Sequence, residues 1–184
     1  WEARAQGPSL PAEVIRDGQP AKVIEDYVNE WMGKLESSEA ETMLRGRDKL
    51  LEPLGDKNAG VAFRQTFSRA AVSRLQKLAD GPAHNNAINA MRVAGAIATF
   101  ESGTLLTGKL SDAEPARRRF AAVQLGRIFA AIDAATPAIS PLDAKALVDR
   151  LAAAVVTEQD ANVLQGIVHH LLAATQIERE SFSG

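Results

Sequence analysis

The sequence predicts an all-α fold in which short helices pack as hairpins, one beside the next. Three observations predict it. Apolar residues recur at helical spacing over most of the chain, and no segment alternates apolar and polar residues as a strand does. Only 5% of the 184 residues are aromatic and alanine is abundant, which suits closely packed helices better than sheets. A Leu-x-Asp pair, followed by a turn and a helix, recurs along the chain.

The first two helices follow a segment that is rich in proline and glycine. We expect residues 1–20 to form an extended arm with one short helical turn at 12–16. From Ala21 an apolar stripe that includes Tyr27 and Trp31 predicts a helix as far as Leu35. Ser37 or Ser38 is placed to cap the next helix, and Glu41 completes a capping box with Ser38. Pro53 and Gly55 mark the region where that helix ends.

The rest of the chain divides into further helices. The stretch "DGP" at 80–82 breaks one of them, and 133–143 is the most evident loop. Within that loop, Ser140 is placed to cap the following helix, with Pro141 at its first position. The helices are expected at about 59–79, 84–99, 102–110, 114–134, 140–157 and 160–179.

The recurring pair has a physical explanation. The leucine ends one helix in the core, and the carboxylate in the turn accepts from free N–H groups at the start of the next helix. Gly95 and Gly126 hold similar places in their helices and allow a neighbouring helix to come close. An isolated helical hairpin cannot bury both sides of its apolar stripe, whereas stacked hairpins can. The pairs are Leu54/Asp56, Leu78/Asp80, Leu110/Asp112 and, as a looser echo, Val156/Glu158.

The segment "LSDAEPARRRFAAVQLGRI" at 110–128 resembles the HEAT family of helical repeats, through Leu110, Asp112, Pro115, Leu125 and Gly126 among others. The resemblance covers about 54–178 and is fair at 78–97, but three arginines follow Ala116 where the family usually has Val then Arg. It implies a right-handed α-α superhelix, a HEAT-like solenoid of about three to four helical hairpins. We therefore expect a single repeat domain at 21–184, with N-terminal capping helices at 21–54 and repeats at 55–179. The alternative is an ordinary helical bundle.

Charge is unevenly distributed along the chain, whose net charge is −2 and pI about 6.0. Residues 61–130 carry 10 Lys/Arg against 4 Asp/Glu, and both flanking parts are acidic. This basic middle is either a chance distribution over solvated helix faces or a surface for an anionic partner. No apolar run is long enough for a membrane span, so we expect a soluble protein. The sequence leaves two compartments open: the cytoplasm, or an extracytoplasmic one if Trp1 follows a removed signal peptide.

The search for chemistry leaves no catalytic, cofactor or metal site to propose. The chain has no cysteine, no Gly-x-Ser-x-Gly elbow and no phosphate-binding loop. His169 and His170 are adjacent on a helix and point about 100° apart, so we expect one at the core edge and one facing out. The carboxylates at 36–52 are interpreted as a solvated helix face. We therefore expect no enzyme.

The remaining candidate is a basic interaction surface. It consists of Arg64, Arg92, Lys109, Arg117, Arg118, Arg119 and Arg127. Within it, one or two of the arginines at 117–119 are expected to pair with turn carboxylates such as Asp112 or Asp80.

The HEAT resemblance implies a protein–protein interaction or scaffolding module, because that family mostly holds partners together. The alternative is a nucleic-acid or phosphate-binding protein that uses the basic surface, although such domains are usually far more basic. Trp31 is expected to help cap the stack, and an exposed Trp31 would instead mark self-association.

Overall fold

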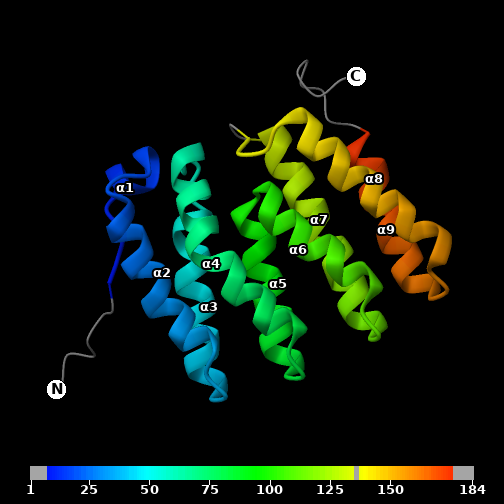
Figure 1. Cartoon of the computed structure of the whole chain (residues 1–184), viewed down its shortest axis with the longest axis horizontal. Coiled ribbons are helices and arrows are strands. Elements are labelled where there is room, and N and C mark those ends of the chain that lie inside the picture. The colour runs from blue at the N-terminus through cyan, green and yellow to red at the C-terminus, as the bar shows by residue number, and fades with distance from the viewer. Residues whose placement is uncertain (1–7, 135–136, 176–184) are drawn as a thin grey trace.

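This computed structural model describes residues 8–134 and 137–175, and this part of the chain contains nine α-helices and one 3-10 turn (Figure 1). Within that part, the only β pairing is a single bridge between Thr99 and Ala138. The all-α prediction is therefore confirmed. The helices are α1 Ala12–Asp17, α2 Ala21–Leu35, α3 Ala40–Leu54, α4 Val61–Asp80, α5 His84–Ile97, α6 Phe100–Gly108, α7 Pro115–Ala134, α8 Pro141–Thr157 and α9 Ala161–Ala174, with the 3-10 turn η1 at Lys109–Ser111.

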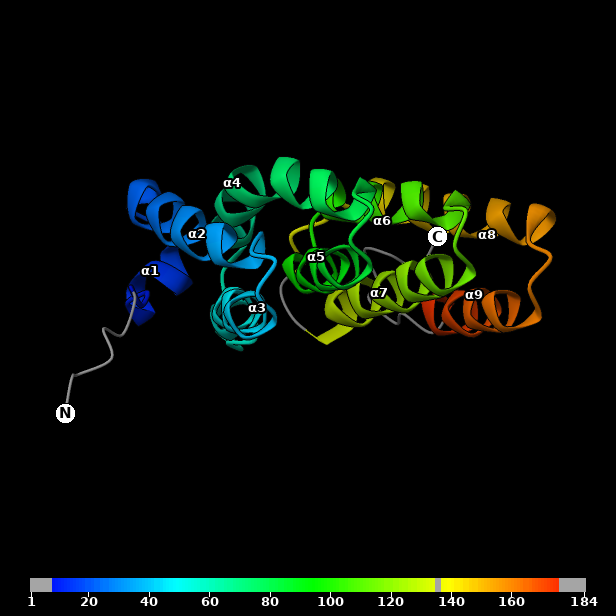
Figure 2. The ribbon, with the colours of Figure 1, turned by 90° about the horizontal axis from the view of Figure 1, so that it is seen from below.

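The helices lie in two layers. Helices α2, α4, α6 and α8 form one layer, and α3, α5, α7 and α9 form the other (Figure 2). Consecutive helices pair across the layers as four hairpins, α2/α3, α4/α5, α6/α7 and α8/α9, and each hairpin packs against the next. The first and last hairpins lie at opposite ends of the row (Figure 1). The arrangement is thus an open row of hairpins.

Most predicted helix ends are close to the observed ones. Pro53 lies in the last turn of α3, and Ser140 caps α8 by accepting from the N–H of Asp143, with Pro141 at the first position. The prediction of a capping box at Ser38 and Glu41 is wrong, because the helix begins at Ala40 without a side-chain cap. A capping box that was not predicted joins Thr99 and Ser102 at the start of α6. Of the helix expected at 160–179, residues 176–179 lie outside the described part.

The core runs between the two layers along the whole row. Its largest fully buried side chains come from hairpins along the row and include Trp31, Phe63, Phe67, Met91, Leu106 and Phe129. Trp31 is only 2% exposed, and its indole N–H donates to the carbonyl of Pro8 at 3.2 Å. Pro8 of the N-terminal arm therefore lies against α2, and Trp31 is buried there. The alternative of an exposed Trp31 is wrong.

Two glycines let neighbouring helices of one layer approach, as predicted. A Cβ atom at Gly95 of α5 would lie 2.7 Å from Oε1 of Gln124 on α7. A Cβ atom at Gly126 of α7 would lie 2.0 Å from Nδ1 of His170 on α9. Both distances are far below ordinary van der Waals contact, so a side chain at either position requires its neighbour to move.

Candidate functional site

The turns inside three hairpins share one hydrogen bond. In each, the side chain two positions after Leu35, Leu110 or Val156 accepts from the backbone N–H two residues further on. Ser37 accepts from Glu39 at 3.1 Å, Asp112 from Glu114 at 3.0 Å and Glu158 from Asp160 at 2.8 Å. Asp56 of the predicted pair Leu54/Asp56 accepts from the N–H of Asn58 in the same way at 2.8 Å, but its turn joins α3 to α4, between two hairpins. The Leu-x-Asp pattern therefore marks this local bond and does not by itself mark the start of a hairpin turn. The bond in the three hairpins also shows that the turn after Leu35 is equivalent to the turns after Leu110 and Val156.

Asp80 does not make this bond, so its predicted capping role is wrong. The residue two positions on is Pro82, which has no N–H to donate. The Asp80 carboxylate instead accepts from the Gln76 side chain at 2.8 Å and pairs with Lys109 of η1. These two partners lower the pKa of Asp80. Because Pro82 offers no N–H, the Asp80 carboxylate is free to bind Lys109 of the next hairpin.

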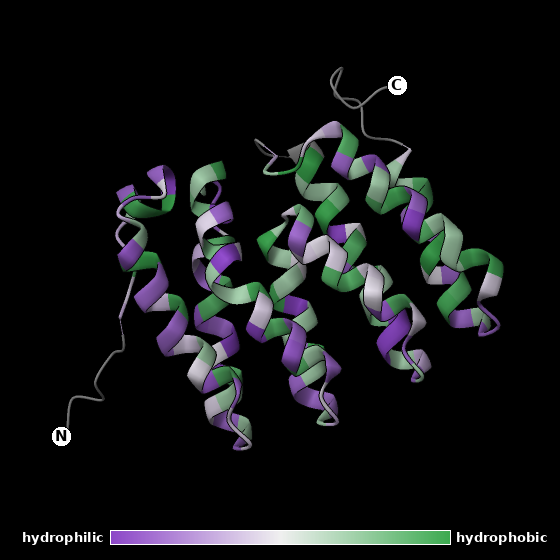
Figure 3. Ribbon diagram, in the orientation of Figure 1, coloured by the Kyte–Doolittle hydropathy of each residue, from purple (hydrophilic) through white to green (hydrophobic). Residues whose placement is uncertain are grey.

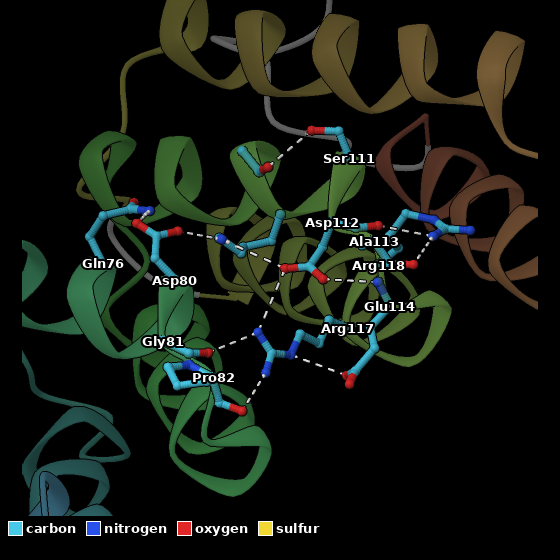
Figure 4. A network of polar contacts seen from close by, with 12 residues as sticks. Gln76, Asp80, Gly81, Pro82, Ser111, Asp112, Ala113, Glu114, Arg117 and Arg118 are labelled. Atoms are coloured by element: carbon cyan, nitrogen blue, oxygen red, sulfur yellow. Dashed lines mark hydrogen bonds and ion pairs between the residues drawn. The ribbon is translucent and has the colours of Figure 1, made fainter.

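Lys109 and Arg117 connect neighbouring turns and are largely buried. Lys109 is 9% exposed and lies between Asp80 and Asp112, with its Nζ 3.7 Å from the latter carboxylate. Arg117 is 8% exposed and donates to the carbonyls of Gly81 and Pro82 at 3.1 and 3.4 Å (Figure 4). Arg117 also lies 3.8 Å from the Asp112 carboxylate, as expected for an arginine that pairs with a turn acid.

Arg118 reaches forward to the last hairpin. Its guanidinium forms a two-pronged pair with the carboxylate of Glu158, with N–O distances of 2.7 and 2.8 Å, and donates to the carbonyl of Asp112 at 2.9 Å. The Glu158 side chain is 3% exposed. The turns of the second, third and fourth hairpins are thus tied together. We call this network the turn ladder; it consists of Asp80, Lys109, Asp112, Arg117, Arg118 and Glu158.

The Glu158 pair predicts a stability that falls in acid. Its bonds with Arg118 and with backbone N–H groups lower the pKa of Glu158 from its ordinary value of 4.5 to about 2. A lowered folded-state pKa stabilises the fold above pH 4.5, and this contribution is lost as the pH falls towards about 2. Urea unfolding is expected to show Glu158→Gln less stable than the wild type at pH 7 by about 2 kcal/mol, with the difference shrinking towards pH 2. A difference that does not change with pH would contradict this role.

Arg64 also acts inside the fold. It donates to the carbonyls of Leu54, Ala96 and Ile97 at 3.0, 2.8 and 3.2 Å, and burial lowers its pKa. These carbonyls belong to the ends of α3 and α5, where a cation is favourable. Four members of the expected basic surface, Arg64, Lys109, Arg117 and Arg118, are therefore engaged within the chain. They do not form one open surface with the other three.

Arg92 and Arg127 come together on the solvent side of the α5/α7 layer, and Arg47 of α3 joins them. The Arg92 guanidinium carbon lies 5.7 Å from the centroid of the Phe120 ring. Burial, then the positive charges of Arg47 and Arg127, lower the pKa of Arg92. We call Arg47, Arg92 and Arg127 the arginine row. Arg47 and Phe120 were not among the predicted site residues, because nothing in one sequence shows which helices lie side by side.

The arginine row is incompletely neutralised. Arg47 pairs with Asp48 at 2.6 Å and donates to the Asn89 side chain at 3.2 Å. Among the side chains described, by contrast, no carboxylate forms an ion pair with Arg92 or Arg127, and the buried Nε of Arg92 has no hydrogen-bond partner. Among the described side chains, the half-buried Arg92 and the exposed Arg127 thus form no ion pair, and the charge of Asp48 only partly offsets the effect of Arg47 and Arg127 on Arg92.

Arg119 points elsewhere, into a surface groove between α7 and α9. The groove has a volume of about 370 Å³ and is lined by Arg119, Val123, Asn162, Gln165, Gly166, His169 and His170. His169 is exposed, and His170 is half-buried against Gly126, as expected for two adjacent histidines at the edge of the core. In the described residues, no group of three His, Asp or Glu side chains could hold a metal ion.

Comparison with known proteins gives no further assignment. The chain matches no protein-family model, and it matches no curated protein. Across residues 8–134 and 137–175, no helix has the length and apolar content needed to cross a membrane.

Proposed function

We propose that this chain is a non-catalytic, HEAT-like protein-binding module. In this proposal the row of hairpins is a right-handed solenoid, and the α3/α5/α7 face holds an acidic segment of a protein partner. The observation that carries the proposal is the unpaired charge of Arg92, which is stacked on Phe120 between two other arginines.

The cost of this cluster in the free protein supports a binding role. Like charges at short range repel, and a buried guanidinium N–H without a partner loses the hydrogen bond that water would supply. By contrast, the chain pairs the buried Lys109 and Arg117 and the half-buried Arg118 with carboxylates or carbonyls. A carboxylate from a partner would relieve both costs at Arg92 through a charge-assisted hydrogen bond.

The shape of the molecule favours a broad contact over a reaction site. A row of hairpins presents long faces and contains no single central cavity. The groove between α7 and α9, about 370 Å³ in volume, is open to solvent, and its lining contains no pair of an acid and a base. These features support a scaffold.

The arginine row predicts salt-sensitive binding of an acidic peptide. A labelled oligoglutamate peptide, titrated by fluorescence anisotropy, is expected to bind in low salt and to weaken as salt rises from about 50 to about 300 mM, because exposed charges are screened. Arg127→Glu should weaken binding about tenfold, which corresponds to about 1.4 kcal/mol. The matched control is Lys77→Glu on α4, an exposed cation in the other layer, which should change the affinity less than twofold, that is, by under about 0.5 kcal/mol.

The same titration with a short DNA duplex tests the second candidate function. Arg92 and Arg127 would also suit phosphate, since guanidinium groups bind both anions. Tighter binding of the duplex than of the peptide at equal salt would replace the protein partner with a nucleic acid. An affinity for the peptide that Arg127→Glu leaves unchanged would overturn the role of the arginine row.

A further inference from the structure

Exposed aliphatic side chains concentrate on the last hairpin. Among the described residues, six large hydrophobic side chains are exposed, and four of them belong to α8 or α9. These four are Leu142 at 77%, Val156 at 86%, Val168 at 42% and Leu172 at 61%. The other two, Val23 and Leu44, are 37% and 39% exposed and lie on the first hairpin. Figure 3 shows hydrophobic colour over much of α8 and α9.

The four side chains share the side of the hairpin that faces away from the rest of the row. On α8, Leu147 and Leu151 are buried towards α6, and a helical turn of 100° per residue places Leu142 and Val156 on the opposite side. On α9, Val163 and Ile167 are buried, and Val168 and Leu172 lie away from α7. We call this surface the end face; it consists of Leu142, Lys145, Asp149, Ala152, Val156, Val168 and Leu172.

The end face continues the series of contacts that builds the fold. Each of the three earlier hairpins buries the corresponding side against the hairpin that follows it. Among the described hairpins, the last is the one whose corresponding side no following hairpin covers, and this side presents aliphatic residues that such a contact would bury. A surface that presents two parallel rows of aliphatic side chains from α8 and α9 fits another pair of helices.

We infer that the end face binds the end face of a second copy of this chain, about a two-fold axis. Lys145 and Asp149 lie near the middle of α8 and are 2.7 Å apart. If two copies of α8 pack antiparallel about the level of Leu147, Lys145 of each copy faces Asp149 of the other. The same register sets Leu142 against the small Ala152 of the second copy. The face is therefore complementary to itself in both charge and shape.

Helix α9 independently favours the same axis. Thr157 ends α8 ten residues after Leu147, about 15 Å along the helix. Only three residues separate it from Ala161, where α9 begins its return, so the level of Leu147 on α9 is close to Leu171. Val168 and Leu172 are centred on position 170, which is one residue from Leu171. The axis that pairs Lys145 with Asp149 thus also packs Val168 of each copy near Leu172 of the other.

The size of the face predicts a weak dimer. A 17-residue helix is about 25 Å long, and two adjacent helices are about 20 Å wide, so two copies would bury roughly 1,000 Å² in total. This area is at the lower limit of specific interfaces. We therefore expect micromolar dissociation. The dimer would leave the α3/α5/α7 face free, so it is independent of the proposed function.

Sedimentation velocity over about 1 to about 300 µM protein tests the dimer. The wild type is expected to shift from monomer to dimer, and Leu172→Glu should weaken the dimer at least about tenfold, because it buries a carboxylate in an apolar contact. The matched control is Leu44→Glu, which places the same charge at an exposed leucine on the first hairpin and should leave dimerisation unchanged. Circular dichroism checks that both variants remain folded.

A charge exchange tests the two-fold register. Asp149→Lys gives the face two positive charges and Lys145→Glu gives it two negative ones, so each variant alone should dimerise about tenfold more weakly. An equimolar mixture should restore association to near that of the wild type. A wild type that stays monomeric would overturn the proposal and leave the end face to a different protein. A dimer that Leu172→Glu does not weaken, or a mixture no stronger than its components, would overturn it as well.

Discussion

Replacing Phe67 with alanine is expected to lower the free energy of unfolding by about 3–5 kcal/mol. Phe67 is fully buried on α4, and its ring packs edge-on against Phe63 at a centroid distance of 5.7 Å. Helix α4 contacts α2 in its own layer and α5 in the other. The variant therefore loses apolar burial and opens a cavity where two hairpins meet. Urea unfolding followed by circular dichroism measures the change.

The control for Phe67→Ala is Val23→Ala on α2. Val23 is 37% exposed, so its truncation should cost less than about 1 kcal/mol. A Phe67→Ala variant as stable as this control would show that the two layers do not share the core described for them.

Replacing Gly126 with leucine is expected to detach the last hairpin, at a cost of about 3 kcal/mol. A Cβ atom at Gly126 would lie 2.0 Å from Nδ1 of His170, so a leucine must displace this half-buried ring from the contact between α7 and α9. The last hairpin contacts the row through α9 against α7 and through α8 against α6, and the contact of α9 with α7 is the more extensive. We expect the far-UV circular dichroism to lose helical signal from α8 and α9, which contain 17 and 14 residues.

Much of the fold is predictable from the sequence because its determinants are local. Apolar residues at 3.6-residue spacing predict the helices, and Pro141 after Ser140 marks a helix start through the proline's missing N–H and the serine's side-chain oxygen. The small side chains at Gly95 and Gly126 predict close helix packing. Each of these signals depends on residues within a few positions of one another.

Features that depend on distant residues could not be predicted in the same way. The left-handed conformation of Ala98, with φ 55°, ends α5 without the glycine that usually marks such a position. Pro82 shows locally that Asp80 cannot make the turn bond of the other acids, but the pairing of Asp80 with Lys109 depends on the packing of two hairpins. A local pattern suggests a cap, and only the packed structure supplies the competing partner.

The candidate site was predicted only in part, for a related reason. The basic middle of the sequence contains Arg92 and Arg127, which do reach the surface together. The same basic middle also contains Lys109 and Arg117, which carboxylates and carbonyls hold inside the turn ladder. A count of charges along the sequence cannot distinguish these two residues from Arg92 and Arg127. The difference depends on which helix face each residue occupies and which turn lies beside it.

Residue-level hydrogen exchange on the Gly126→Leu variant tests most directly whether the fold is an open row of hairpins. In such a row each hairpin depends mainly on its neighbours. We predict that amides of α8 and α9 exchange about a hundredfold faster than in the wild type, while those of α2–α5 change less than about threefold. An equal acceleration in every helix would contradict the row and indicate one closed core.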